Sequence, residues 1–451
     1  MLTMVSAVML RKTIVSLALF VSVVFLYHFF LTDMESYWFI GYGVALFGGV
    51  SYLIAARHYY YQVTYVFTLL QLIGLTLAIA PYLIYPDLEL NIRKAVYIHS
   101  IGLLVFLWLY TLMGLGTSEV KTDSKSMMDE KLWAQFFSAN KGIFLLSLPG
   151  VLVAMVASGG WQAYAGLSAE GGYDRVASMK GMGPLMIFSV LNVFSGFFVA
   201  YGFFQLKKYG KALLFIVFFL VLNSFTHSRG STITVMLLFY FFLGFRSGLR
   251  VRYLAVFGAL GLFIVFMKIT RSATGLEIDD AARFFLLNFS GDFDSVVNTE
   301  HLASYIESNH FIGLYHIWSN VLVYVPRFFY PDKSHFLGGL YLNDLIFPGL
   351  YLGAEGGTGF SFGMIGTLYA VAGVPTILLG LAMVAIFLRT FEGKMSRSAL
   401  NRPNGPLIFY LFLMSNVIIL YRDGLYAIIN TFFYFTCYMM VLFFVRRKWV
   451  I

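Results

Sequence analysis

The chain carries little charge for its length and has a single cysteine. Only 12% of its 451 residues are charged, whereas soluble domains carry about 25%, so too few charges are present to cover a large water-facing surface. Cys437 has no second cysteine to pair with, which excludes an intramolecular disulfide and leaves too little sulfur for a thiolate metal cluster. The sequence therefore excludes a soluble globular enzyme and a disulfide-stabilised secreted domain.

Apolar residues make up 59% of the sequence, and the mean hydropathy is +0.79. A helix needs about 20 mostly apolar residues to cross a bilayer, and its backbone polar groups are satisfied within the segment. Repeated apolar runs of this length predict an all-α, polytopic transmembrane helical bundle, with residues 1–451 forming one membrane domain. We expect about twelve spans, at 13–31, 37–55, 62–84, 96–115, 142–158, 184–204, 211–226, 232–246, 251–270, 363–388, 407–421 and 425–445.

The links between these spans alternate in charge. Most of the 31 lysines and arginines, but few of the 22 acids, fall in one set of links, which includes "QLKKYGK", "FRSGLRVR" and the C-terminal "RRK". The positive-inside rule therefore predicts that both termini are cytoplasmic. The net charge of +9 needs no nucleic-acid partner, because basic residues beside anionic lipid act as topological signals.

Residues 271–362 form the longest link, and the predicted topology places it on the outer face. The first part has helical spacing with negative charge, and the later stretch "VLVYVPRFFYPDK" is aromatic and interrupted by prolines. This composition predicts a large extracytoplasmic loop of short helices that lies on the bundle as a cap. The sequence has no internal repeat of the kind common among transporters.

A few cations lie at the predicted outer ends of the spans, on a face that is otherwise acidic. Guanidinium groups bind phosphate oxygens in pairs, so these cations suit an enzyme that holds a phosphorylated lipid. A structural alternative stays open for each, because an arginine at a span end also reaches headgroups, caps a helix or pairs with a neighbouring acid such as Asp423. The residues are Arg229, Lys268, Arg271, Arg327, Lys333 and Arg422.

Five stretches in this order resemble the Wzy-type O-antigen and oligosaccharide repeat-unit polymerases. The resemblance covers residues 220–430 best. Its elements are "HSRGSTITVML", then Lys268 and Arg271 at a span end, "YVPRFFYPDK", "GAEGGTGFSFGMIGTLYAVAG" and a "YRDG" turn before the last span.

The resemblance implies a glycosyltransferase of the bacterial inner membrane with its active site facing the periplasm. Both substrates are then glycans linked to undecaprenyl pyrophosphate, and the growing chain passes from its carrier to the non-reducing end of a new repeat unit. Neither a metal nor another cofactor is expected, and a chain-length-regulating co-polymerase of the Wzz type is an expected partner. Arginine then does what a metal does elsewhere: it stabilises the departing pyrophosphate.

We assign that catalytic role to Arg229, Arg271 and Arg422, and substrate binding to Lys268, Arg327 and Lys333. The general base stays open among Asp423, His227, Glu355 and Asp332, with Asp423 and His227 slightly favoured and Glu355 otherwise a substrate-binding residue. Aromatic side chains of the loop offer stacking surfaces for sugars, or pack the loop on the bundle. They include Trp318, Tyr324, Phe328, Phe329 and Tyr330.

Three other functions compete with the polymerase. An O-antigen ligase-like transferase uses the same donor but a different acceptor. A flippase or transporter of lipid-linked glycans is disfavoured by the long outer loop and the absence of a repeat. A non-catalytic scaffold for envelope assembly would leave Arg229 and Arg422 freely replaceable.

Overall fold

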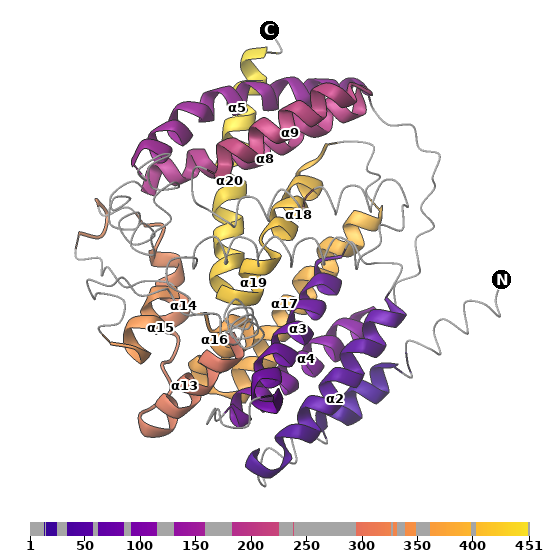
Figure 1. Ribbon diagram of the computed structural model, residues 1–451, viewed down its shortest axis with the longest axis vertical. Coiled ribbons are helices and arrows are strands. Elements are labelled where there is room, and N and C mark those ends of the chain that lie inside the picture. The colour runs from indigo at the N-terminus through magenta and orange to yellow at the C-terminus, as the bar shows by residue number, and fades with distance from the viewer. Residues whose placement is uncertain are drawn as a thin grey trace, which may run out of the picture.

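In a computed structural model, the described part of the chain is entirely helical (Figure 1). Long apolar runs favour helices because a helix satisfies its backbone hydrogen bonds internally. The described residues are 15–24, 34–56, 62–84, 92–114, 130–157, 183–224, 295–325, 328–331, 339–348, 361–397 and 403–449, together with Thr13 and Leu238.

Seven of the described helices are long and apolar enough to cross a membrane. Each corresponds to a predicted apolar run, so the all-α class and the membrane-spanning character of the chain are confirmed, although the total of twelve spans is not. The seven are α2 (Met34–Ala55), α3 (Val63–Ile84), α4 (Arg93–Met113), α5 (Glu130–Ala157), α8 (Gly183–Gln205), α17 (Val374–Arg397) and α20 (Leu425–Trp449).

The helices pack in two groups that α20 joins. Helices α5, α8 and α9 (Tyr209–Ser224) lie together, and α2, α3, α4 and α17 form the second group, as Figure 1 shows. Between them, α20 contacts both α5 and α8, and the hydroxyl of Tyr438 donates a 2.6 Å hydrogen bond to Asn140 Oδ1 of α5. Helix α20 also contacts α18 (Gly405–Ser415) and α19 (Val417–Asp423), which pack on α17 and α3, so it links the first group to the second through them.

Two predicted spans differ from the observed helices in their limits or their course. Helix α5 begins at Glu130, within the stretch expected to be a polar link. The run at 363–388 is two helices, because Gly373 has a φ of 76° and separates α16 (Gly363–Ala372) from α17. The two fold back on each other: a Cβ placed on Gly380 would overlap the side chain of Leu368. One straight span at 363–388 was therefore a wrong prediction.

The predicted span at 407–421 is also interrupted. It consists of α18 (Gly405–Ser415) and α19 (Val417–Asp423), which meet at Asn416. Helix α18 begins at a side-chain cap, where Leu407 N donates to Asn404 Oδ1 over 2.9 Å. The expected spans at 232–246 and 251–270 lie outside the described residues, apart from Leu238.

Three short helices are described within the predicted outer loop: α13 (Ser295–Ser308), α14 (Tyr315–Leu322) and α15 (Gly339–Ile346). Helix α13 does not lie on the outside of the bundle. It packs against α3, α4 and α16, and Glu300 Oε2 accepts a 2.8 Å hydrogen bond from Ala95 N in the first turn of α4. The N-terminal half of α13 therefore lies inside the bundle, antiparallel to α4.

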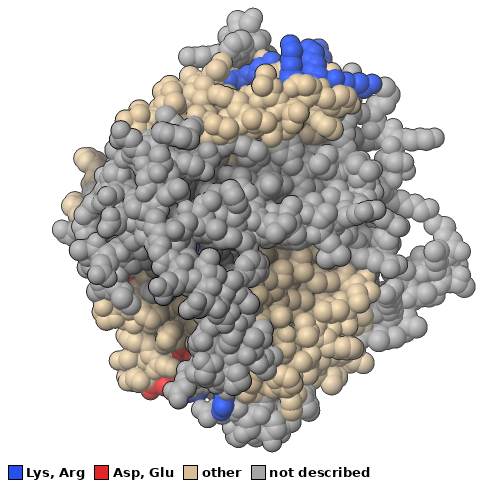
Figure 2. Space-filling model, viewed as in Figure 1, with Lys and Arg blue, Asp and Glu red and all other residues tan. Residues whose placement is uncertain are grey.

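Figure 2 shows a group of Lys and Arg side chains at one end of the molecule, over α5, α8 and α9, and carboxylates near α13 at the other. Lys207 and Lys208 in the link between α8 and α9, and Lys211 in the first turn of α9, are exposed. This link belongs to the set that the sequence predicts to be cytoplasmic. Basic side chains also lie at the carboxylate end in Figure 2, and Lys94 forms a 2.7 Å ion pair with Glu307 of α13.

Candidate functional site

Arg422 occupies the last turn of α19, directly before a tight backbone reversal. Gly424, with a φ of 62°, makes that reversal and leads into α20. The preceding residue, Tyr421, is fully buried, and its hydroxyl lies against Gly74 of α3, where a Cβ would overlap it. Gly74 is ten residues before the end of α3 at Ile84, about 15 Å along that helix. The turn that carries Arg422 therefore starts at a buried residue, and the Arg422 side chain itself is half-buried.

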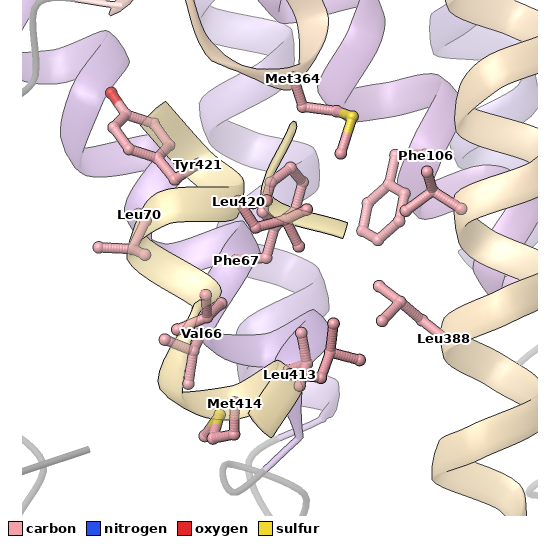
Figure 3. Packing of buried hydrophobic residues seen from close by; sticks show 14 of the residues in the cluster. Val66, Phe67, Leu70, Phe106, Met364, Leu388, Leu413, Met414, Leu420 and Tyr421 are labelled. Carbon is pink, nitrogen blue, oxygen red and sulfur yellow. The ribbon is translucent and has the colours of Figure 1, made fainter. Parts of the chain in front are cut away.

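Figure 3 shows buried hydrophobic residues that pack beneath this turn. Tyr421 and Leu420 of α19 lie beside Leu70 and Phe67 of α3, with Met364 of α16 close by. All five side chains are at least 95% buried. Such packing fixes the backbone of α19. The Arg422 side chain therefore projects from a well-packed helix rather than from a loop.

A second glycine turn meets the first. Gly363 begins α16 with a φ of 65°, and a Cβ added to it would lie 2.9 Å from the carbonyl oxygen of Tyr421. A Cβ added to Gly424 would likewise lie 2.9 Å from the carbonyl oxygen of Gly363. Both positions need glycine for the backbone angle and for the contact. The start of α16 is thus joined to the turn between α19 and α20.

Side-chain hydrogen bonds tie the Arg422 turn to α13. Ser361 Oγ donates to the carbonyl oxygen of Arg422 over 2.6 Å, and Asn298 Nδ2 donates to the carbonyl oxygen of Ser361 over 2.9 Å. Both Ser361 and Asn298 are buried. Because buried hydrogen bonds are costly to break, they set the position of Arg422 relative to α13 and α16.

A buried histidine extends this network to α3 and α4. His99 Nε2 lies 3.0 Å from Thr299 Oγ1, and Thr299 Oγ1 donates to the carbonyl oxygen of Ser295 over 2.7 Å. On its other side, His99 Nδ1 lies 3.5 Å from Gln71 Oε1 of α3. His99 therefore braces α3, α4 and α13.

Several buried polar atoms of this region have no hydrogen-bond partner among the described residues: Arg422 Nε, Ser295 Oγ and Gln71 Nε2. Buried donors in native proteins are almost always paired with protein, water or ligand. The Arg422 guanidinium also forms no ion pair with a described residue. Among the described residues, the site thus presents a half-buried cation without an ion-pair partner and several buried polar atoms without hydrogen-bond partners.

Of the site residues predicted from sequence, the structure describes the side chains of Arg422 and Tyr330. Asp423 is the last residue of α19, and its side chain is outside the described part. Tyr330 is 38% exposed, whereas Arg422 is half-buried. The remaining predicted residues lie outside the described residues: His227, Arg229, Lys268, Arg271, Arg327, Asp332, Lys333 and Glu355.

Sequence reasoning missed the buried polar residues around Arg422. His99 and Gln71 lie singly within apolar spans, while Ser295 and Thr299 lie in a link that was expected to cover the bundle. The sequence did carry one signal of a polar site: a histidine and a glutamine lie within predicted spans. Polar groups at such depth usually face other polar groups. Their convergence on one point depends on tertiary structure.

The loop aromatics divide into two kinds. Tyr324 packs on α20: its hydroxyl donates a 2.6 Å hydrogen bond to Asn430 Oδ1, and its ring stacks on Phe433 at 4.4 Å between centroids. Phe328 and Phe329 are instead 86% and 73% exposed. Tyr324 therefore fastens the chain after α14 to α20, whereas Phe328 and Phe329 remain available to lipid or substrate.

A second buried polar cluster surrounds Glu392 at the opposite end of α3 and α4. Glu392 Oε1 accepts from Thr64 N over 3.0 Å in the first turn of α3, and the hydroxyls of Tyr110 and Tyr410 also donate to the carboxylate. Arg389 Nη1 donates to the Tyr110 hydroxyl over 3.4 Å. The Glu392 carboxylate, which belongs to α17, therefore caps the N-terminus of α3 and also joins α3 to α4 and α18. This is a structural role.

No family model matches this chain, and neither the curated proteins nor the solved structures give a match. In the described ranges, no three His, Cys, Asp or Glu side chains lie close enough together to hold a metal ion. The fold and the site therefore define a helical membrane protein with a buried, arginine-containing polar centre.

Proposed function

We propose that this protein is a polymerase of undecaprenyl-pyrophosphate-linked oligosaccharide repeat units. It would make O-antigen or a related surface polysaccharide in the bacterial inner membrane. Its termini would be cytoplasmic and its active site would open to the periplasm. This proposal joins the motif resemblance over residues 220–430 to the chemistry around Arg422.

The observation that carries the proposal is the Arg422 side chain. Its Nε is buried without a partner among the described residues, while the Arg422 backbone is held by Ser361. A charged group inside an apolar bundle is expensive, and ionisable residues kept there usually serve function. A guanidinium forms paired, charge-assisted hydrogen bonds with phosphate oxygens, which is the interaction that a pyrophosphate-linked substrate offers.

The proposed reaction breaks the bond between the reducing-end sugar of the growing chain and the pyrophosphate oxygen. A hydroxyl at the non-reducing end of a new repeat unit attacks that sugar carbon, and its proton passes to a general base. The bonding electrons leave with undecaprenyl pyrophosphate, so charge grows on the phosphate as the bond breaks. Cations placed there in advance stabilise the transition state more than the ground state.

The proposed roles follow the sequence assignments. Arg422 acts with Arg229 and Arg271 on the leaving group, and Asp423 or His227 takes the proton. Other proposed substrate-binding residues are Lys268, Arg327, Lys333, Glu355 and Tyr330. A Wzz-type co-polymerase remains the proposed partner for control of chain length.

One structural observation favours a second candidate, a flippase or transporter of lipid-linked glycans. Helices α13 and α16 are short and begin inside the bundle. Transporters commonly use discontinuous helices whose ends meet at a substrate site within the membrane. An O-antigen ligase-like transferase is a third candidate, because it would use the same pyrophosphate donor site.

Reconstitution of the purified protein in liposomes with undecaprenyl-pyrophosphate repeat units separates the three candidates. A ladder of glycan lengths on a gel supports the polymerase. Transfer that occurs only when lipid A core is added indicates a ligase, and movement of the lipid across the bilayer without a new glycosidic bond indicates a transporter. A liposome preparation that lacks the protein is the control for spontaneous flipping and hydrolysis.

A further inference from the structure

Helix α14 turns its apolar side outward and its polar side inward. His316, Ser319 and Asn320 are at most 1% exposed. Trp318 is instead 59% exposed, and Leu314, directly before the helix, is 73% exposed. The exposed side chains recur at the spacing of one helix face: Leu314, Tyr315, Trp318 and Val321. The helix contains no lysine, arginine, aspartate or glutamate, so its outward face is an uncharged, apolar surface.

This arrangement is the reverse of the one that water favours. A helix on a water-facing surface directs its polar residues to solvent and its apolar residues to the core. In α14, burial leaves both ring nitrogens of His316 and the Oδ1 of Asn320 without a hydrogen-bond partner among the described residues. Water would satisfy these atoms if they faced outward. The inversion therefore indicates that the medium outside α14 is apolar.

The chain before α14 is fastened to one end of a membrane span. The backbone N–H of Ile312 donates to the carbonyl oxygen of Ala370 over 2.9 Å, near the C-terminal end of α16. The ring of Phe311 lies against Gly373, where an added Cβ would be 2.9 Å from the ring. Gly373 directly precedes the apolar span of α17, Val374–Glu392. Helix α14 therefore begins close to the end of this span.

The chain after α14 is fastened to a second span. The hydroxyl of Tyr324 donates to Asn430 Oδ1. The Tyr324 ring stacks on Tyr426 and Phe433, at 6.2 Å and 4.4 Å between centroids. These partners lie near the start of α20, whose apolar span is Leu425–Val445. Because both flanks are held at span ends, α14, which is about 12 Å long, lies at the boundary of the membrane rather than beyond it.

Lipid fits this face better than a second protein does. Only 33% of the α17 span and 22% of the α20 span are buried, so both spans present apolar side chains to the bilayer. Helix α14 packs on α20, and its outward face continues that surface at the end of the spans. Tryptophan and tyrosine are enriched where acyl chains meet headgroups, and the outward face offers Trp318 and Tyr315. It offers no charge for a polar partner to recognise.

We propose that the outward face of α14 lies in the bilayer, at the level where the acyl chains meet the headgroups, and that its partner is membrane lipid. The predicted topology makes this the outer leaflet. A short helix of a link that the sequence predicts to cap the bundle from outside then belongs to the membrane-embedded part of the protein. Its polar face is turned to the protein interior and its apolar face to lipid. This contact does not depend on the polymerase function.

Fluorescence quenching in liposomes tests the contact. In a Cys437→Ser background of the full-length protein, single cysteines replace Trp318 or Val321, are labelled in detergent with an environment-sensitive fluorophore, and are reconstituted. Lipids that carry a nitroxide near the headgroup should quench both labels more strongly than lipids that carry it near the chain end. Iodide on both sides of the membrane should quench them several-fold less than a label at Ser308, an exposed position at the end of α13.

A label at Met383, exposed in the middle of the α17 span, is the control for lipid contact and should be quenched most by the nitroxide near the chain end. Iodide quenching at Trp318 and Val321 equal to that at Ser308, without quenching by lipid, would place the face in water and overturn the proposal. Protection from both quenchers would show that a second copy of the chain covers the face, which would also overturn it. The two outward positions are read independently, so a folding defect in one variant leaves the other as the test.

Discussion

Gly363 and Gly424 face each other so closely that a Cβ on Gly424 would lie 2.9 Å from the Gly363 carbonyl oxygen. Each has a positive φ; Gly363 begins the short helix α16, and Gly424 follows the short helix α19. This contact holds α16 and α19 together directly beside Arg422. The position of the candidate catalytic arginine therefore depends on two residues that have no side chain.

Gly424→Ala should lower stability and abolish polymer formation. The backbone angle costs about 1–3 kcal/mol for a non-glycine residue, and the new methyl group would also collide with Gly363 and Thr367. Thermal unfolding in detergent measures the loss. Gly43→Ala is the control: nothing lies within 4 Å of a Cβ there, so it should be neutral or stabilising. Equal unfolding temperatures in Gly424→Ala and the wild type would contradict the backbone contact.

Glu392→Gln should destabilise the protein by about 2–3 kcal/mol, as expected for loss of hydrogen bonds to a buried charged group. The new amide directs donors at Thr64 and Tyr110, which themselves donate to the carboxylate. The matched control is Glu307→Gln, which breaks the 2.7 Å ion pair with Lys94 at a glutamate whose side chain is 51% exposed. That change should cost about 0–1 kcal/mol, and an equal loss in both variants would reject the capping role of Glu392.

The buried His316 side chain should make the free energy of unfolding sensitive to acid. Burial lowers the pKa of His316 to about 4, and neither ring nitrogen has a hydrogen-bond partner among the described residues. The unfolded chain binds the proton near pH 6.5, so the free energy of unfolding should fall as the pH drops from 6.5 to 4. At about 1.4 kcal/mol per pH unit, the loss totals about 3 kcal/mol.

His316→Phe should reduce this loss by the His316 contribution of about 3 kcal/mol and leave stability at pH 8 unchanged or higher. The phenyl ring keeps the stacking on Tyr341, 6.4 Å away between centroids, and has no nitrogen that needs a partner. Thermal unfolding between pH 4 and pH 8 measures the difference. His310→Phe, at an exposed position, should retain the wild-type slope. An undiminished loss in His316→Phe would show that another group titrates.

Thiol labelling tests the expected topology. In a Cys437→Ser background, a cysteine at Ser308 should react with an impermeant reagent applied from the periplasmic side, and a cysteine at Lys208 should not. Both positions are exposed in the structure, so a difference in labelling reports the side of the membrane. Labelling of Lys208→Cys alone would invert the orientation and move the proposed site to the cytoplasmic half.

The lengths of the apolar runs in the sequence predicted the limits of α3, α4 and α8 closely, because a bilayer span needs a continuous apolar run. The same criterion failed at Gly373, where both α16 and α17 are apolar and hydropathy does not register a reversal of direction. The sequence does carry a signal there, since Gly373 is followed at once by Val374 and Pro375, and a proline often opens a new helix.

The candidate site was predictable only in part. Arg422 was identified because an arginine in a short turn between apolar runs needs an explanation, and its YRDG context added the resemblance. Ser295 was not, because it is an ordinary residue in its own helix, and His99 gave only the signal of a polar residue within an apolar span. They become informative only when α13 enters the bundle, and no local pattern in residues 295–308 distinguishes a buried helix from a surface one.

The most direct test of the account is the reconstituted polymerisation reaction with Arg422→Lys at matched protein levels. Lysine keeps the charge but loses the planar fork that binds two phosphate oxygens. Loss of one charge-assisted hydrogen bond, about 1.5–3 kcal/mol, should slow chain elongation about ten- to a hundredfold, leaving mostly single repeat units. A wild-type ladder at the wild-type rate from Arg422→Lys would contradict the central claim that this arginine binds the pyrophosphate leaving group.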